Sequence, residues 1–183
     1  MKNKFLKYPL VLGIVGIICA LCLGVVYWVT NPIITERTKK QALEAIQTIC
    51  PTADSSEDVS AQYPNCGDYT ITTVYDVKQS GNQLGVAYQA KGVGYGGDIV
   101  YLVVLSSTEE KILGINFISH SETSGYGADL IAKQEFIEWF NGLSFAEFDG
   151  GTDLSTGATK TMTGVKKSLT KVIEFHTTVK EAA

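Results

Sequence analysis

Basic residues, cysteine and histidine are all scarce in the larger, C-terminal part of this sequence. From Asn31 onward, 12 Lys and Arg residues accompany 19 Asp and Glu residues, which gives this part a formal charge of −7. Proteins that bind nucleic acid usually present clustered positive charge to its phosphates. Nucleic acid is therefore not an expected partner. The chain also has no internal repeat, and its 183 residues suit one domain with one extra element.

The four cysteines do not indicate a metal site. Cys19 and Cys22 lie in an apolar run, where such residues usually serve as small packing side chains. Cys50 and Cys66 lie beyond that run, and a disulfide between them is chemically permissible in an oxidising compartment. We expect no metal ligands, and the sequence leaves the disulfide open.

Two further sites are excluded by their context. His120 begins the segment HSETSGYGADL, but neither a nucleophile elbow nor a clear acidic partner accompanies it, as a Ser-His-Asp triad requires. GVGYGG has glycines spaced as in a dinucleotide fingerprint, yet the strand-like DIVYLVVL follows it where that fingerprint needs a helix. We interpret GVGYGG as a hairpin turn, or as a turn that lets a bulky ligand approach the backbone.

One long apolar run, PLVLGIVGIICALCLGVVYWVT, extends from Pro9 to Thr30. About 20 apolar residues in a helix cross the ~30 Å hydrocarbon core of a bilayer. The core of a cleaved signal peptide is shorter. Residues 1–30 are therefore predicted to form a basic tip and a single transmembrane helix, which contacts the lipid bilayer through residues 10–29.

The charges on either side of the run indicate its orientation. Three lysines and the amino terminus precede it, and three basic residues follow it: Lys2, Lys4, Lys7, Arg37, Lys39 and Lys40. The positive-inside bias favours a cytoplasmic N-terminus. We expect a single-pass protein of the cell (inner) membrane with its C-terminal domain on the extracytoplasmic side.

Residues 31–66 are predicted to form an amphipathic stalk helix and a loop. The segment NPIITERTKKQALEAIQTI has apolar residues near helical period after an irregularity at Pro32. The segment CPTADSSEDVSAQYPNCGD is polar and lacks periodicity, as loops do.

Residues 67–183 are predicted to form one domain. Four segments rich in β-branched and aromatic residues indicate antiparallel strands: YTITTVYDV, QLGVAYQAK, DIVYLVVLSS and KILGINFIS. Helical spacing follows in GADLIAKQEFIEWFNGLS and in KTMTGVKKSLTKVIEFHTTVKE. Strands followed by helices indicate an α+β fold with an antiparallel sheet and flanking helices.

The stretch DLSTGATKT begins at Asp153 and leads into the last predicted helix. It suits an ordinary helix start with Thr159 or Thr161 as the N-cap. A helix N-terminus also has free N–H groups and positive partial charge, which favour a bound phosphate. The small residues Gly157 and Ala158 leave the adjacent hydroxyl accessible. A plain cap and a phosphate-bearing ligand are both compatible with these residues.

Two of these segments resemble a family of flavoproteins. DLSTGAT is similar to the D-x-x-[ST]-G-A-T acceptor motif of flavinylated domains. HSETSGYG resembles the H-x-E-T-x-G-x-G segment of the G subunit of Rnf electron-transport complexes and of the related C subunit of the sodium-pumping NADH:quinone reductase. The span, the GYGG turn and the C-terminal helix occur in the same order, so the resemblance covers essentially the whole chain. Ser124 stands where many relatives have proline, and the chain is short for the C subunit, which favours the Rnf assignment.

The resemblance implies an FMN-binding domain with covalent FMN, joined through its phosphate to Thr159. The candidate cofactor-binding residues lie in the two motifs and the glycine turn: Asp153, Thr156, Gly157, Ala158, Thr159, Glu122, Thr123 and Gly96. A separate flavin transferase would attach FMN from FAD, because no residue near Thr159 in the sequence activates its hydroxyl. Glu122 and Thr123 would hydrogen-bond the flavin, and Tyr95 or Tyr126 would line its ring or simply pack.

The implied function is that of an electron-carrier subunit, not catalytic on its own, in an Rnf-type ion-translocating ferredoxin:NAD oxidoreductase complex. Its partners would be the other membrane subunits of that complex. Three alternatives stay open: a subunit of a sodium-pumping NADH:quinone reductase, a flavinylated domain of an unrelated reductase, and a cofactor-free membrane-anchored assembly module. The lysines of the last helix either balance a phosphate or form a solvated face.

Overall fold

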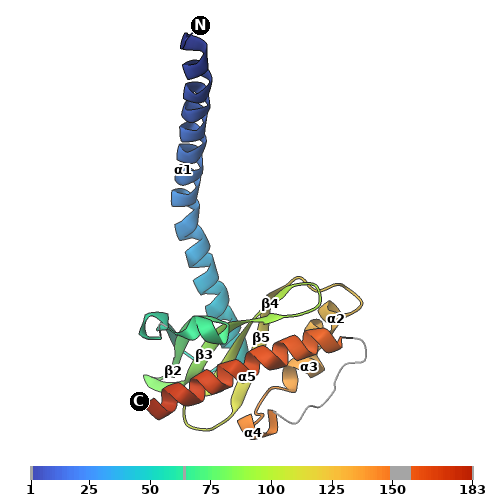
Figure 1. The fold of residues 1–183 in the computed structure, drawn as a ribbon. Coiled ribbons are helices and arrows are strands. Elements are labelled where there is room, and N and C mark those ends of the chain that lie inside the picture. Colours follow the sequence, from blue (N-terminus) through green and yellow to red (C-terminus); the bar gives the residue numbers. More distant parts are fainter. Residues whose placement is uncertain (1, 64, 149–157, 183) are drawn as a thin grey trace. The chain divides into compact units, whose positions relative to one another are not determined.

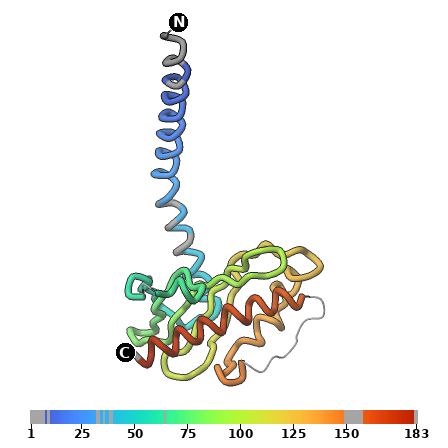
Figure 2. The backbone as a smooth tube through the Cα atoms, viewed as in Figure 1, coloured from blue at the N-terminus to red at the C-terminus, as the bar shows by residue number. Residues whose placement is uncertain are grey.

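The computed structural model describes residues 2–63, 65–148 and 158–182. The chain divides into two compact units, Met1–Lys40 and Gln41–Ala183, and each is described by itself. Helix α1 (Lys2–Ile49) makes up the described part of the first unit and continues into the second (Figures 1 and 2).

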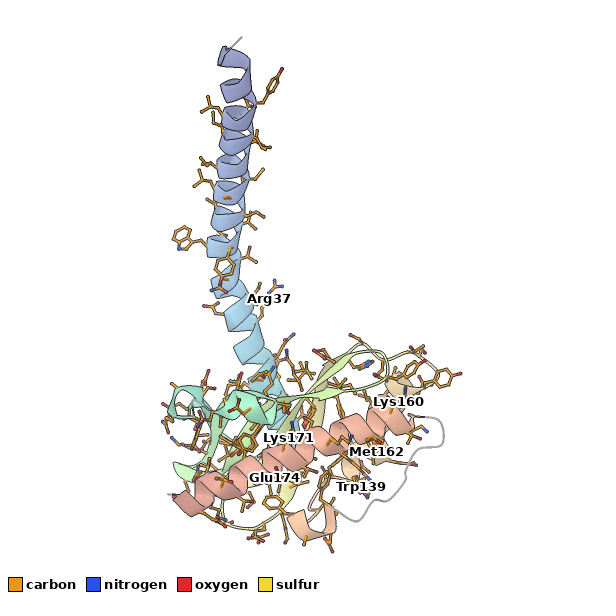
Figure 3. The ribbon with its side chains drawn as sticks, viewed as in Figure 1. Arg37, Trp139, Lys160, Met162, Lys171 and Glu174 are labelled. Carbon is orange, nitrogen blue, oxygen red and sulfur yellow. The ribbon has the colours of Figure 1, made fainter. Side chains whose placement is uncertain are left out.

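The first unit contains a segment suited to a single-pass membrane anchor. Leu10–Asn31 comprises 22 residues with a mean hydropathy of 2.8, and its apolar side chains are exposed along the helix (Figure 3). This agrees with the predicted apolar helix. The backbone of α1 stays helical at Pro32, where the sequence predicts an irregularity. A proline removes one N–H donor. The loss of one hydrogen bond does not interrupt this helix of 48 residues.

The second unit is built on a five-stranded antiparallel sheet in which each strand pairs with its neighbours in sequence. Its strands are β1 (Ser55–Asp58), β2 (Ile71–Gln79), β3 (Asn82–Val93), β4 (Asp98–Ser106) and β5 (Ile112–His120). The predicted antiparallel sheet and α+β class are confirmed. A short glycine-rich turn joins β3 to β4, which align from Gly85 with Ser106 to Val93 with Asp98.

Both faces of this sheet are covered, because alternate side chains point to opposite sides. Leu102 of β4 is buried in a cluster with Ile46 from the end of α1. Val103, the next residue, is buried in the cluster that contains Leu169 of helix α5 (Thr159–Ala182). Figure 1 shows α5 lying across the sheet. The compact unit therefore includes the end of α1, which the sequence assigns to the stalk.

The segment predicted as a loop contains regular structure. It forms the edge strand β1 and the 3-10 turns η1 (Ser60–Gln62) and η2 (Cys66–Tyr69). Among the described residues strand β1 pairs with β2 alone. It is largely exposed, so its residues are polar and show no alternation. The prediction of a loop is wrong here because an edge strand needs few apolar residues.

The helix predicted after β5 is divided in two. Helices α2 (Gly127–Ala132) and α3 (Gln134–Glu138) are separated by Lys133, whose backbone is extended at φ −72° and ψ 123°. The division lets Ile131 and Phe136 both be buried in one core. A further short helix, α4 (Phe145–Phe148), was not predicted from the sequence.

The cysteines of the second unit are free thiols. Cys50 is buried and Cys66 is half-buried, and burial raises the pKa of the Cys50 thiol. These two cysteines therefore form no disulfide with each other. Within the described ranges no group of three or more His, Cys, Asp or Glu side chains is arranged to hold a metal ion.

Candidate functional site

Glu122 joins three segments that are distant in sequence. It follows β5 and is 9% exposed. One carboxylate oxygen accepts the N–H of Gly96 in the β3–β4 turn at 2.9 Å, and the other accepts the hydroxyl of Thr161 in the first turn of α5 at 2.5 Å. A buried carboxylate needs such donors. The glycine turn, the segment after β5 and the start of α5 are therefore held together at one point.

Two glycines let the chain come close to this carboxylate. A β-carbon at Gly94 or at Gly127 would overlap the Glu122 carboxylate, and the one at Gly127 would also overlap the Thr161 hydroxyl. Gly94 of GVGYGG and Gly127 of HSETSGYG thus have a packing reason. Gly164 of α5 similarly lies against the carbonyl of Val93, which brings the turn onto the helix.

Helix α5 begins at Thr159, and the residue before it, Ala158, holds the N-cap position. The carbonyl of Ala158 accepts the N–H of Met162 at 3.0 Å, the first hydrogen bond of the helix. Alanine has no side-chain acceptor for the free N–H groups of a first helical turn. The prediction of Thr159 or Thr161 as the cap is wrong, because Thr159 is already helical and the hydroxyl of Thr161 bonds to Glu122.

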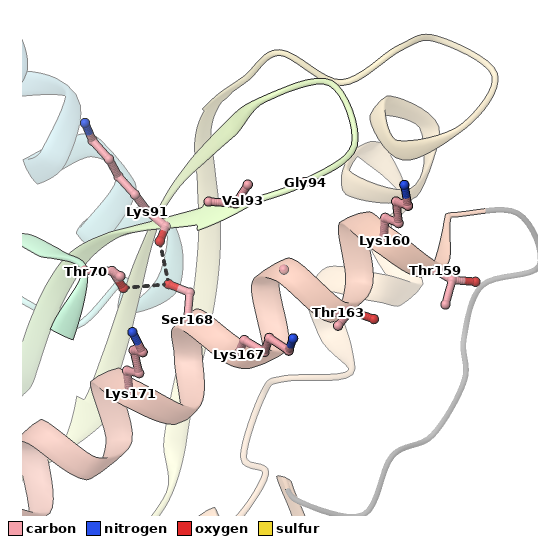
Figure 4. Close-up of a pocket in the computed structure, with 11 residues that line it drawn as sticks. Thr70, Lys91, Val93, Gly94, Thr159, Lys160, Thr163, Lys167, Ser168 and Lys171 are labelled. Carbon is pink, nitrogen blue, oxygen red and sulfur yellow. Dashed lines mark hydrogen bonds between the residues drawn. The ribbon is translucent and has the colours of Figure 1, made fainter.

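The side chains around the start of α5 form two clefts. The aromatic cleft, of about 490 Å³, is lined by Tyr95, Thr123, Tyr126, Gly127 and residues 158–161. The lysine cleft, of about 460 Å³, lies along α5 and β3 (Figure 4). Its lining residues are Thr70, Lys91, Val93, Gly94, Thr159, Lys160, Thr163, Gly164, Lys167, Ser168 and Lys171. Thr159 and Lys160 belong to both clefts.

Exposed aromatic rings mark the first cleft. Tyr95 is 71% exposed and Tyr126 is 64% exposed. The ammonium group of Lys160 lies 5.0 Å from the centre of the Tyr95 ring, within the range of a cation–π contact. Two accessible rings beside a cationic group suit a flat aromatic ligand that bears negative charge.

A buried hydroxyl network supports the second cleft. Ser168 of α5 donates to the carbonyl of Lys91 at 2.8 Å, accepts from the hydroxyl of Tyr101 at 2.8 Å and lies 3.0 Å from that of Thr70. Burial raises the pKa of Tyr101, so its hydroxyl remains a donor. These contacts fix β3 against α5, and Figure 4 shows the bonds that Ser168 makes to Lys91 and Thr70.

The structure brings together those candidate residues that it describes. Glu122, Gly96, Thr123, Ala158 and Thr159 all lie around the start of α5. The candidates Asp153, Thr156 and Gly157 lie outside the described residues. His120, the histidine considered for a triad, is exposed at the end of β5.

Sequence reasoning missed two contributions to this region. Thr161 was considered only as a cap, although its side chain is 1% exposed and bonds to Glu122. Lys91 lies on a strand and was not grouped with the lysines of α5, which it joins at one cleft. No local pattern signals either contact, because both depend on how α5 packs on the sheet.

Comparisons with known proteins identify the domain that contains this site. A family model described as the FMN-binding domain matches residues 94–174, which include Glu122 and Thr159. A protein of Stutzerimonas stutzeri, named as the G subunit of an ion-translocating oxidoreductase complex, is 31% identical over 96% of this chain and 82% of its own length. A protein with the same name from Cereibacter sphaeroides is 30% identical over 87% of this chain and 78% of its own length. Another, from Methanosarcina acetivorans, is 28% identical over 95% of this chain and 95% of its own length.

Proposed function

This chain belongs to the family of G subunits of ion-translocating oxidoreductase complexes, and we propose that it carries FMN as a phosphoester on Thr159 and relays electrons between other subunits of such a complex. The observation that carries the proposal is the position of Thr159. It is the exposed first residue of α5, and it lies at the junction of the aromatic and lysine clefts.

The residues around Thr159 are compatible with FMN. The aromatic cleft, of about 490 Å³, has the size of a small-molecule site, which is typically about 300–1,000 Å³. Tyr95 and Tyr126 offer ring faces to a planar group. A phosphate on Thr159 would lie beside the first turn of α5 and near Lys160, where positive charge stabilises it. When bound, FMN supplies the redox chemistry by accepting and releasing electrons.

Attachment requires a second protein. The Thr159 hydroxyl is a weak nucleophile without an adjacent base, and the described side chains that line its two clefts include no carboxylate and no histidine. We propose that a flavin transferase supplies the base and uses FAD. A bond then forms between Thr159 Oγ and the phosphorus of the FMN half, the phosphoanhydride bond breaks, AMP leaves, and the hydroxyl proton passes to the transferase. The exposure of Thr159 supports such access.

The remaining residues position this site. Both oxygens of Glu122 already accept hydrogen bonds from Gly96 and Thr161, which supports a positioning role for Glu122 and leaves direct flavin contacts to Thr123 and the two tyrosines. No proton transfer is needed at the protein for simple electron relay. We therefore propose that the chain is a carrier and is not catalytic on its own.

The first unit is proposed to anchor this carrier in the cell membrane through Leu10–Asn31. Lysines at positions 2, 4 and 7 precede the span, and the positive-inside bias favours their retention in the cytoplasm. The domain with Thr159 would then lie on the extracytoplasmic side. A covalent link would keep its cofactor from diffusing away there.

The attachment site is tested by co-expression of the full chain with a flavin transferase, followed by denaturing electrophoresis. We expect in-gel flavin fluorescence for the unaltered chain and none for Thr159→Ala. Thr163→Ala is the matched control, because Thr163 is also exposed on α5 and lines the lysine cleft. Fluorescence that persists in Thr159→Ala, or an intact mass without a flavin adduct in the unaltered chain, would refute the proposal.

A further inference from the structure

Positive charge in the second unit is concentrated in one place. Gln41–Ala183 contains 9 lysines, no arginine, and 18 Asp and Glu residues, so its formal charge is 9 minus 18, or −9. Four of these lysines line the lysine cleft, and no acidic side chain among the described residues lines it (Figure 4). Three of these four lysines come from α5, so an otherwise acidic domain carries a local excess of positive charge there, and its surface potential is strongly uneven.

Three of these lysines form a stripe along α5. Lys160, Lys167 and Lys171 are spaced by seven and four residues, so they lie on one face of α5 over about 16 Å. Lys91 faces the helix with its backbone carbonyl, which accepts the Ser168 hydroxyl, and its ammonium group points away from α5 (Figure 4). All four side chains are exposed. The ion pairs found in the described part of the chain use Lys78 and Lys111 and none of these four.

The flavin alone does not account for this stripe. A phosphodiester on Thr159 carries one negative charge, and Lys160 lines both clefts beside it. Lys171 lies twelve residues further along α5, about 18 Å away at 1.5 Å per residue. Interactions between exposed charges are strongly screened beyond about 8 Å at physiological ionic strength. A phosphate on Thr159 therefore does not explain the position of the far lysines.

We propose that the lysine cleft docks an acidic surface of a redox partner protein and thereby brings that partner beside Thr159. The inference rests on the proposed function, since the docked partner would exchange electrons with the flavin at Thr159. Small-molecule sites bury about 70–90% of their ligand, whereas these lysines are exposed. They therefore suit contact with a protein surface better than an enclosed small anion.

The test uses the full chain assembled with the other subunits of its complex in washed membranes. Lys167→Gln combined with Lys171→Gln removes two charges from the stripe and leaves Thr159 and Lys160 in place. We expect the rate of flavin reduction or reoxidation by the partner to fall about tenfold at low ionic strength, and its dependence on salt to flatten. Arginine at both positions should retain the rate.

A matched variant combines Lys133→Gln and Lys180→Gln, which removes two exposed charges outside the cleft. It should keep the rate and salt dependence of the unaltered chain.

The proposal is overturned if both double variants behave alike, or if the cleft variant is slower with an unchanged salt dependence. Flavin content is measured in every sample: loss of covalent flavin in the cleft variant would assign the lysines to attachment and overturn the docking proposal, whereas absence of flavin from the unaltered chain would instead refute the proposed function.

Anionic lipid is the competing source of negative charge. The same comparison is therefore repeated after reconstitution of the complex in phosphatidylcholine alone. A difference between the two double variants that persists there supports protein docking. A difference that disappears without anionic lipid would assign the cleft to the membrane surface and overturn the proposal.

Discussion

The hydroxyl of Thr161 donates a hydrogen bond to the carboxylate of Glu122, 39 residues earlier in the chain. The same carboxylate accepts the N–H of Gly96. Thr159 lies two residues before Thr161, so the Glu122 contact sets where the proposed attachment site stands relative to the β3–β4 turn. The segment HSETSGYG and the start of α5 are thus joined by a hydrogen bond and are not merely adjacent.

Glu122→Ala should lower the free energy of unfolding by about 2–3 kcal/mol, because it leaves a buried hydroxyl and a partly buried N–H without an acceptor. Chemical denaturation of the full chain in detergent, followed by circular dichroism, measures this change. Glu110→Ala removes an equally charged but exposed side chain and should change stability by less than about 0.5 kcal/mol. Equal effects of the two variants would contradict the linking role of Glu122.

Gly127→Ala should destabilise the domain by about 1–3 kcal/mol, as overpacking commonly does. The added β-carbon would overlap both the Glu122 carboxylate and the Thr161 hydroxyl. Thermal unfolding of the full chain measures the loss. Gly67→Ala is the control, since a β-carbon there meets no atom within 4 Å. A melting temperature of Gly127→Ala as high as that of the control would show that the residues around Gly127 can shift without a loss of stability.

His176 should make the domain less stable in mild acid. It is buried on α5, and its Nδ1 lies 2.9 Å from the hydroxyl of Tyr88. Burial and the charge of Lys180 lower the pKa of His176 below its ordinary value of 6.5. The unfolded chain then binds a proton more readily than the folded one, so stability is complete above about pH 6.5 and is lost as the pH falls through the lower folded pKa.

Denaturation between pH 8 and pH 5 measures this dependence. His176→Gln should flatten it in the range just below pH 6.5, whereas His120→Gln should not, because His120 is exposed at the end of β5. The chain has only these two histidines, so the pair of variants separates buried from exposed titration. An unchanged profile in His176→Gln would place the acid sensitivity in the carboxylates.

Elements with a clear hydrophobic pattern were predictable from the sequence. The span and β4 are continuous apolar runs, the other long strands and α5 carry apolar residues near the spacing of their structure, and the structure has all of them. Edge strand β1 is largely exposed, so it carries no alternation to detect. The break at Lys133 between α2 and α3 reflects burial of side chains on both sides, which local spacing does not encode.

The candidate site was predictable only in part, for a similar reason. Its motif residues could be named because two segments resemble a known family. The bond from Thr161 to Glu122 and the contribution of Lys91 to the lysine cleft depend on how α5 packs on the sheet. Such contacts join residues far apart in sequence, and a single chain offers no pattern that pairs them.

Tyr95 and Tyr126 should determine the environment of the flavin ring without affecting its attachment. Replacing both with leucine should leave in-gel fluorescence unchanged, because attachment depends on Thr159. Stability should change by less than about 0.5 kcal/mol, since both side chains are more than half exposed.

In the native protein the visible circular dichroism of the flavin should weaken and its fluorescence rise, because the ring loses its aromatic neighbours. Val93→Ala, in the lysine cleft, should alter neither signal. Native spectra that match the unaltered chain would place the ring outside the aromatic cleft, and a spectral change in Val93→Ala alone would move it to the lysine side of Thr159.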